Sequence, residues 1–205
     1  SHCNPPVRMA RRSLPHSERP LAAFEQGLLM PASLNRRQLL SRSTAAGFFM
    51  VAGQWLWLTP QEAQARAFEP QILSPDQCNA LSSLGDAFVP GAAAGGIAAY
   101  IDLQLQAGDD SLLIGKYLGV DTSAQTGFYR AAADNVIALT DESTSLQTFI
   151  ADMAANSLSN WAGPPASYVL FVLRADALDV VYGTPEGFDA LGIPYMAHIK
   201  PEKPW

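Results

Sequence analysis

Residues 166–182 read Ala-Ser-Tyr-Val-Leu-Phe-Val-Leu-Arg-Ala-Asp-Ala-Leu-Asp-Val-Val-Tyr, and this stretch decides the fold class. Residues 168–173 are all apolar, a pattern that fits a short buried strand as well as a buried helix. The residues that follow, from Arg174 to Asp179, continue a helical pattern, and no strand–turn–strand signature occurs elsewhere in the sequence. We therefore predict an all-α domain whose central and most buried helix spans 166–182 and is apolar on all sides.

Other helices are predicted from their start and stop signals. Ser74-Pro75-Asp76-Gln77 places an N-cap serine before a proline at the first helical position, with a glutamine three residues after the cap. Apolar residues then recur at helical spacing until Pro90-Gly91 ends the element. The same signals predict helices over 97–106, over 122–139 and from Ser143 onward, and a capped single turn at 184–188. The expected fold is a small bundle of about five helices over residues 66–190.

Charge divides the chain into two parts. Residues 1–65 hold seven Arg, no Lys and three Glu, whereas residues 66–205 hold six basic and sixteen acidic residues. Such a split is typical of a basic targeting segment in front of an acidic body. An acidic body repels phosphate backbones, so we expect no nucleic-acid partner.

The basic segment has the order of a signal peptide. Arg36-Arg37, one residue and then Leu39-Leu40 resemble the twin-arginine export consensus. Residues 43–58 are mostly apolar, but this stretch is too short and too interrupted to span a membrane comfortably. Small residues follow at Ala63, Ala65 and Ala67, where two overlapping A-x-A sites predict cleavage. We predict a twin-arginine signal over 30–65, with an uncleaved N-terminal anchor as the alternative, and an upstream extension over 1–29.

Few residues after the predicted leader could serve as catalytic, metal-binding or cofactor-binding groups. His198 is the one histidine after residue 65, and no nucleophile or carboxylate constellation accompanies it in the sequence. Cys78 falls on an apolar helical face, which favours a buried and inert thiol. Neither a G-x-G-x-x-G nor a C-x-x-C motif is present, so we expect no cofactor in this chain. Because twin-arginine passengers typically carry a cofactor, the sequence indicates a partner that holds one.

The C-terminal residues 191–205 form a proline-punctuated tail that can be neither a long helix nor a central strand. Large apolar side chains in such a segment need to be covered, either by a partner or by the bundle itself. We favour the partner. The predicted interface residues are Tyr182, Phe188, Ile193, Tyr195, Met196, His198, Ile199 and Trp205.

Several motifs together resemble the gluconate 2-dehydrogenase subunit 3 family. They are the twin-arginine leader, Leu73-Ser74-Pro75, Asp86-x-x-x-Pro90-Gly91, the run Val-Tyr-Gly-Thr-Pro-Glu-Gly-Phe at 181–188, Leu191-Gly192-Ile193-Pro194, and the closing Pro204-Trp205. The similarity covers residues 33–205, and its C-terminal motif is the most specific part.

The resemblance implies a non-catalytic small subunit of a membrane-associated dehydrogenase that oxidises gluconate, glucose, fructose or sorbitol. Its partners would be a GMC-type large subunit with FAD and, in many members, an iron–sulfur cluster, and a multihaem cytochrome c subunit. The small subunit would help the large one fold and escort it through the twin-arginine translocase to the periplasm. The alternative is a small periplasmic enzyme or binding protein that acts alone.

Overall fold

The computed structural model describes residues 46–141 and 144–193, and helices dominate these residues, which confirms the all-α prediction. Five helices of the described chain have ten residues or more: α3 (Pro75–Phe88), α5 (Ile97–Ala107), α7 (Thr122–Leu139), α8 (Leu146–Ala155) and α9 (Ala166–Tyr182). The shorter elements are α2 (Pro60–Ala65), α4 (Ala92–Gly95), the 3-10 turn η2 (Gly108–Asp110), α6 (Ile114–Tyr117) and α10 (Pro185–Ala190).

The helix signals of the sequence hold in detail. Ser74 is the N-cap of α3, its hydroxyl accepts a hydrogen bond from the Gln77 backbone, and the Gln77 side chain accepts one from the Ser74 backbone. This reciprocal pair satisfies two backbone donors that the helix start would otherwise leave unpaired. Helices α7 and α9 occupy their predicted ranges, and α8 begins three residues after the predicted start at Ser143.

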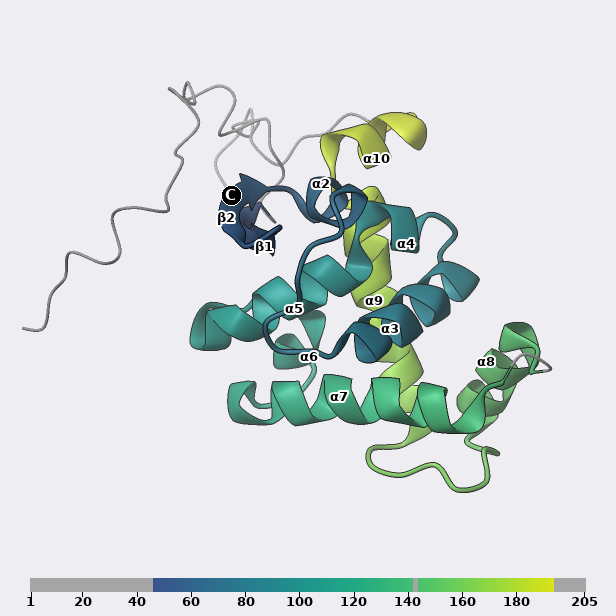
Figure 1. The fold of residues 1–205 in the computed structure, drawn as a ribbon. Coiled ribbons are helices and arrows are strands. Elements are labelled where there is room, and N and C mark those ends of the chain that lie inside the picture. Colours follow the sequence, from purple (N-terminus) through teal and green to yellow (C-terminus); the bar gives the residue numbers. More distant parts are fainter. Residues whose placement is uncertain (1–45, 142–143, 194–205) are drawn as a thin grey trace, which may run out of the picture.

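Helix α9 lies at the centre of the bundle and packs against α3, α4, α5, α6, α8 and α10. Figure 1 shows α10 at one end of α9, with α7 crossing near the other end. The predicted central position of this helix is confirmed, but its apolar side chains are not all buried: Phe171 is 59% exposed and Leu178 also lies at the surface. Phe171, Leu178 and Tyr182 share one helical face, since they are spaced by seven and four residues. Composition alone could not reveal this open face, because each of these residues is as apolar as its buried neighbours.

A β-hairpin precedes the bundle, where the sequence predicted no strands. Strands β1 (Gly47–Val51) and β2 (Gln54–Leu58) pair antiparallel, with Gly47 opposite Leu58. The connecting residues Ala52 and Gly53 both have positive φ, +48° and +74°, as a tight two-residue hairpin requires. The hairpin has a weak signature in the sequence, because its Ala-Gly turn lacks the usual Asn or Asp. The two strands also lie within one mostly apolar stretch, which has the pattern of a signal peptide.

The hairpin and α2 pack on α5, so the folded part of the described chain begins before the boundary predicted at residue 66. Phe49, Leu58 and Ala63 are buried against Ala99, which lies on α5. Within residues 46–141 and 144–193, no helix is long and apolar enough to cross a membrane.

Candidate functional site

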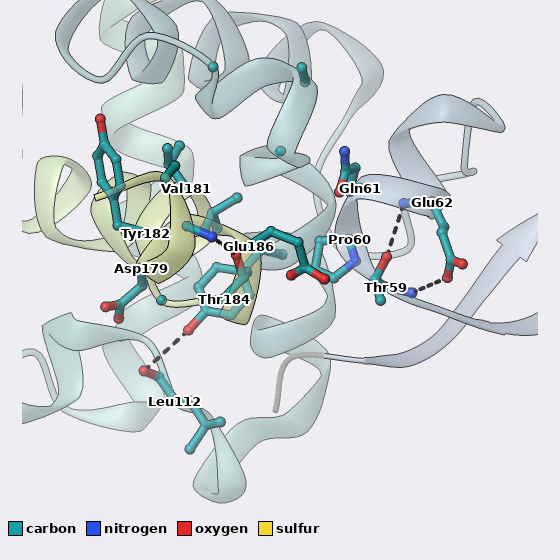
Figure 2. A pocket seen from close by; sticks show the side chains of 18 residues that line it. Thr59, Pro60, Gln61, Glu62, Leu112, Asp179, Val181, Tyr182, Thr184 and Glu186 are labelled. Carbon is teal, nitrogen blue, oxygen red and sulfur yellow. Dashed lines mark hydrogen bonds between the residues drawn. The ribbon is translucent and has the colours of Figure 1, made fainter. Parts of the chain in front are cut away.

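A cleft of about 710 Å³ opens between the N-terminal elements and the C-terminal end of α9. One wall is Thr59 to Glu62 at the start of α2, and the other is formed by α9 and α10 from Asp179 to Ala190. Figure 2 shows Glu186 between the two walls, with Thr59 and Pro60 on one side and Asp179 and Tyr182 on the other. The cleft therefore joins residues more than one hundred positions apart in the sequence.

The α2 wall is fixed by a cap and by a close backbone contact. The Thr59 hydroxyl accepts a hydrogen bond from the Glu62 backbone, and the Glu62 carboxylate accepts one from the Thr59 backbone at 2.9 Å. Gly96 has a φ of +84°, and a Cβ at this position would overlap the Pro60 carbonyl. Glycine at 96 thus lets α2 rest directly on the junction of α4 and α5.

The opposite wall is a compact corner made by residues 182–187. Thr184 is the N-cap of α10 and accepts a hydrogen bond from the Gly187 backbone at 3.0 Å. A Cβ at Gly187 would overlap the Val181 carbonyl, so the backbone of α10 lies directly on the end of α9. The Gly-Thr-Pro-Glu-Gly run, on which the family resemblance partly rests, therefore sets the angle between α9 and α10.

The lining of the cleft includes Tyr100, whose hydroxyl donates a long hydrogen bond of 3.5 Å to the Leu112 carbonyl. Burial raises the pKa of Tyr100 well above its usual range, and the nearby carboxylates of Asp176 and Asp179 raise it further. This phenol therefore stays neutral near neutral pH and acts as a donor. It presents no base or nucleophile to the cleft.

Two buried carboxylates lie in the bundle behind the cleft, and both serve the fold. Asp176 accepts hydrogen bonds from the Tyr129 hydroxyl and from the Ile114 backbone, so it ties α6 and α7 to α9. Burial raises the pKa of Asp176 to about 7, although both hydrogen bonds act in the opposite direction. Asp102 accepts backbone hydrogen bonds from the three residues 71–73 at 2.8 to 2.9 Å. These pairings leave both carboxylates engaged in holding loops and helices.

The chemistry that this arrangement supports best is docking. Glu186 and Asp179 place acidic groups in a cleft whose lining also includes Tyr100, Leu112 and Val180. Interfaces typically have an apolar centre with a polar rim. Among the described residues, no group of three or more His, Cys, Asp or Glu side chains is arranged to hold a metal ion.

The predicted interface residues fall partly on this cleft. Tyr182 lines it, Phe188 lies partly buried on α10, and Ile193 is 49% exposed just beyond α10. The remaining predicted interface residues, Tyr195, Met196, His198, Ile199 and Trp205, lie outside the described residues, as do Arg36, Arg37, Leu39 and Leu40 of the export signal.

The predicted cleavage region is described. Ala63 is fully buried within α2, Ala65 is the last residue of that helix, and Ala67 follows in an exposed turn with a φ of +52°. Cleavage within this region stays a prediction.

No family model, curated protein or solved structure matches this chain. The resemblance described above therefore rests on the motifs of the sequence itself.

The sequence prediction missed the α2 wall, although a usable signal was present. Thr59-Pro60-Gln61-Glu62 has the same capping-box order as Ser74-Pro75-Asp76-Gln77. The same stretch also has the order of a signal peptide, so the two patterns overlap. The buried roles of Asp102 and Asp176 have no local signal, since the backbone groups that they hold lie 29 to 62 residues away.

Proposed function

We propose that this chain is the non-catalytic small subunit of a periplasmic, membrane-associated, FAD-dependent dehydrogenase of sugars or sugar acids. In this role it is the folding partner and twin-arginine escort of the flavin-carrying large subunit. The observation that supports the proposal is that α9, α10 and the residues just beyond them leave several large apolar side chains exposed. Phe171 and Leu178 on α9, and Leu191 and Ile193 beyond α10, are large apolar side chains at exposed positions. Large apolar side chains that stay exposed in the isolated chain favour a surface that binds another protein.

The redox chemistry is assigned to the partners. The large subunit is of the GMC type and carries FAD and, in many members of the resembled family, an iron–sulfur cluster. A multihaem cytochrome c subunit passes the electrons onward, and the twin-arginine translocase acts only during export. This chain supplies the leader with Arg36 and Arg37 and a surface on which the large subunit folds.

A stand-alone periplasmic enzyme or binding protein is the second candidate, and the size of the cleft is compatible with it. A volume of about 710 Å³ lies within the range of small-molecule sites. The two candidates differ in what the isolated chain does. A binding protein saturates with a small ligand without a partner, whereas the escort co-purifies with a flavoprotein.

Export tests the proposal directly. Replacing Arg36 and Arg37 together by Lys keeps the charge but removes the planar guanidinium groups. We expect the double variant to leave this chain and the partner's flavin-dependent activity in the cytoplasm. Arg42→Lys is the matched control, because Arg42 lies in the same leader outside the pair. Undiminished periplasmic flavin activity in the double variant would overturn the escort role.

A further inference from the structure

Helix α9 has two apolar faces, and a single copy of the chain buries only one of them. The buried face belongs to the main core of the bundle and includes Val169, Val172, Leu173 and Ala177. The other face, here called the outer α9 face, consists of Tyr168, Phe171, Ala175, Leu178 and Tyr182. On it, Phe171 and Leu178 are 59% and 40% exposed, and the other three side chains are half-buried. A continuous apolar strip of this kind in water favours a partner that covers it.

The outer α9 face has the spacing of a coiled-coil seam. Its five residues follow one another at intervals of three, four, three and four positions, which is the alternation of the a and d positions in a heptad repeat. Two helices with this repeat pack side by side, and each seam residue of one inserts between four residues of the other. Ala175 at the middle of the seam is small, so a second helix can approach closely there. The spacing therefore points to another helix as the occupant.

The charges beside the seam indicate which helix. Arg174 and Asp179 are exposed and flank the outer α9 face on opposite edges. Because five positions separate them, their side chains point about 140° apart around the helix and cannot meet within one chain. Neither side chain forms a hydrogen bond or an ion pair in the part of the chain that the structure describes. In the heptad register of the seam, Arg174 holds a g position and Asp179 holds the next e position, and such positions pair between two parallel helices.

A second copy of this chain fits the outer α9 face in both respects. In a parallel pair with a two-fold axis along α9, each seam residue meets its own copy. Arg174 of each chain then lies beside Asp179 of the other, so the pair of opposite charges occurs twice. In an antiparallel pair, the two Arg174 edges would lie together and so would the two Asp179 edges. The face is therefore self-complementary in the parallel arrangement.

We propose that this chain forms a parallel two-fold dimer through the outer α9 face. Tyr117 and Leu118 of α6, which are 65% and 37% exposed, extend the contact, because the Tyr168 hydroxyl donates a hydrogen bond to the Leu118 carbonyl. The dimer goes beyond the proposed function and does not rest on it, since the exposed residues beyond α10 are left for the large subunit. It also accounts for the composition of α9, because a helix that is apolar on both faces is then covered on both.

Charge reversal in the full chain tests the pairing, with sedimentation equilibrium as the measurement. Arg174→Asp and Asp179→Arg each place like charges at both contacts between the copies, so each should raise the dissociation constant of the dimer about tenfold or more. Arg66→Asp makes the same charge change at an exposed position outside α9 and should leave the dimer unchanged. The double variant should dimerise again. An equal mixture of the two single variants should form mixed dimers, because each contact then joins opposite charges.

Cysteine cross-linking tests the orientation. In a Cys3→Ser chain, Phe171→Cys and Leu178→Cys are made separately and oxidised, with Cys78 buried in both. The two positions lie about 10 Å apart along α9, and a disulfide requires Cα atoms within about 7 Å. A parallel dimer brings each position next to its own copy, so both variants should form cross-linked dimers, whereas an antiparallel pair allows at most one. Ile137→Cys is the control, because Ile137 is 46% exposed on α7, and it should stay uncross-linked.

Four results would overturn the inference. They are a wild-type chain that sediments as a monomer, unchanged dimerisation in both charge-reversal variants, no mixed dimer in the mixture, and cross-linking at only one of the two cysteine positions. Circular dichroism of each variant distinguishes dissociation from unfolding, since only unfolding lowers the helix content. The proposed function is tested by export and not by dimerisation, so the failure of one is distinguishable from the failure of the other.

Discussion

The hydroxyl of Tyr129 donates a hydrogen bond of 2.6 Å to the carboxylate of Asp176, and both residues are completely shielded from solvent. The pair connects α7 to α9, and the second oxygen of Asp176 receives the Ile114 backbone at the start of α6. Three helices thus meet at one carboxylate, and its protonation state affects the free energy of unfolding of the bundle.

This carboxylate makes a pH dependence measurable. The pKa of Asp176 is raised from 3.8 to about 7, so between these values the folded chain keeps a proton that the unfolded chain has released. Stability should therefore fall as pH rises from about 4 to about 7, with up to about 1.4 kcal/mol lost per pH unit from this group. Urea unfolding at several pH values should show this slope reduced in Asp176→Asn. Asp109→Asn, on the exposed 3-10 turn, should keep it, and equal slopes in all three proteins would contradict the prediction.

Asp102 anchors the segment that leads into α3. It accepts backbone hydrogen bonds from residues 71–73, and the Gln106 side chain donates a further one at 3.0 Å. Asp102→Ala should lower the free energy of unfolding by about 2–4 kcal/mol, because partly and fully buried donors lose their acceptor. Asp109→Ala should change it by less than about 0.5 kcal/mol. Unchanged amide protection at residues 71–73 in Asp102→Ala would count against this role.

Gly96 and Gly91 form a matched pair for testing the close contact of α2 with the backbone at residue 96. Both have positive φ, +84° and +95°, but the space around Gly91 is open, whereas a Cβ at Gly96 meets the Pro60 carbonyl. Gly91→Ala should cost about 1–2 kcal/mol of backbone strain. Gly96→Ala should cost distinctly more and should also raise hydrogen exchange in α2. Equal losses in urea unfolding would show that α2 adjusts without cost.

The thiol of Cys78 should be unreactive toward thiol reagents in the folded protein. The thiol is buried on α3, and its burial, followed by the charge of Asp102, raises its pKa to about 12. In a Cys3→Ser chain, which leaves Cys78 alone, a thiol reagent at pH 8 should react very slowly. Reaction should become fast in denaturing urea. Rapid labelling without denaturant would show that α3 opens readily.

Truncation of the C-terminal tail tests whether its apolar side chains pack on a partner or on the helical bundle. Truncation after Gly192 removes Ile193, Tyr195, Met196, Ile199 and Trp205. If the tail lies on the large subunit, the truncated chain should melt at the wild-type temperature but capture less flavoprotein. A tail that packs on its own bundle predicts the reverse, with a lower melting temperature before any loss of capture. A truncated chain that is both stable and fully active in capture would refute both views.

The sequence predicted the long helices well because their caps are local signals. Ser74 and Gln77 lie three residues apart, and a short window contains everything that starts α3. The surface of α9 could not be predicted in the same way. Whether Phe171 is covered depends on which helices come to lie beside it, and its exposure therefore has no local signal.

The candidate site was predicted only on one side. Tyr182 was recognised through the C-terminal motif, and it does line the cleft. The opposite wall at Thr59 was missed, because an apolar stretch after two arginines has the pattern of a signal peptide whether or not it can also fold. The buried side chains of that hairpin pack on α5, about forty residues further along the chain, and no local window of sequence contains this partner.

That separation has a consequence during synthesis. The hairpin leaves the ribosome before α5 exists, and Phe49 and Leu58 lack their partner Ala99 until residues 97–107 follow. At roughly 5–20 residues per second, the delay lasts roughly 2–8 s. If the leader predicted from the sequence directs export, the order of translation itself sets the time in which its apolar stretch is accessible before α5 covers it.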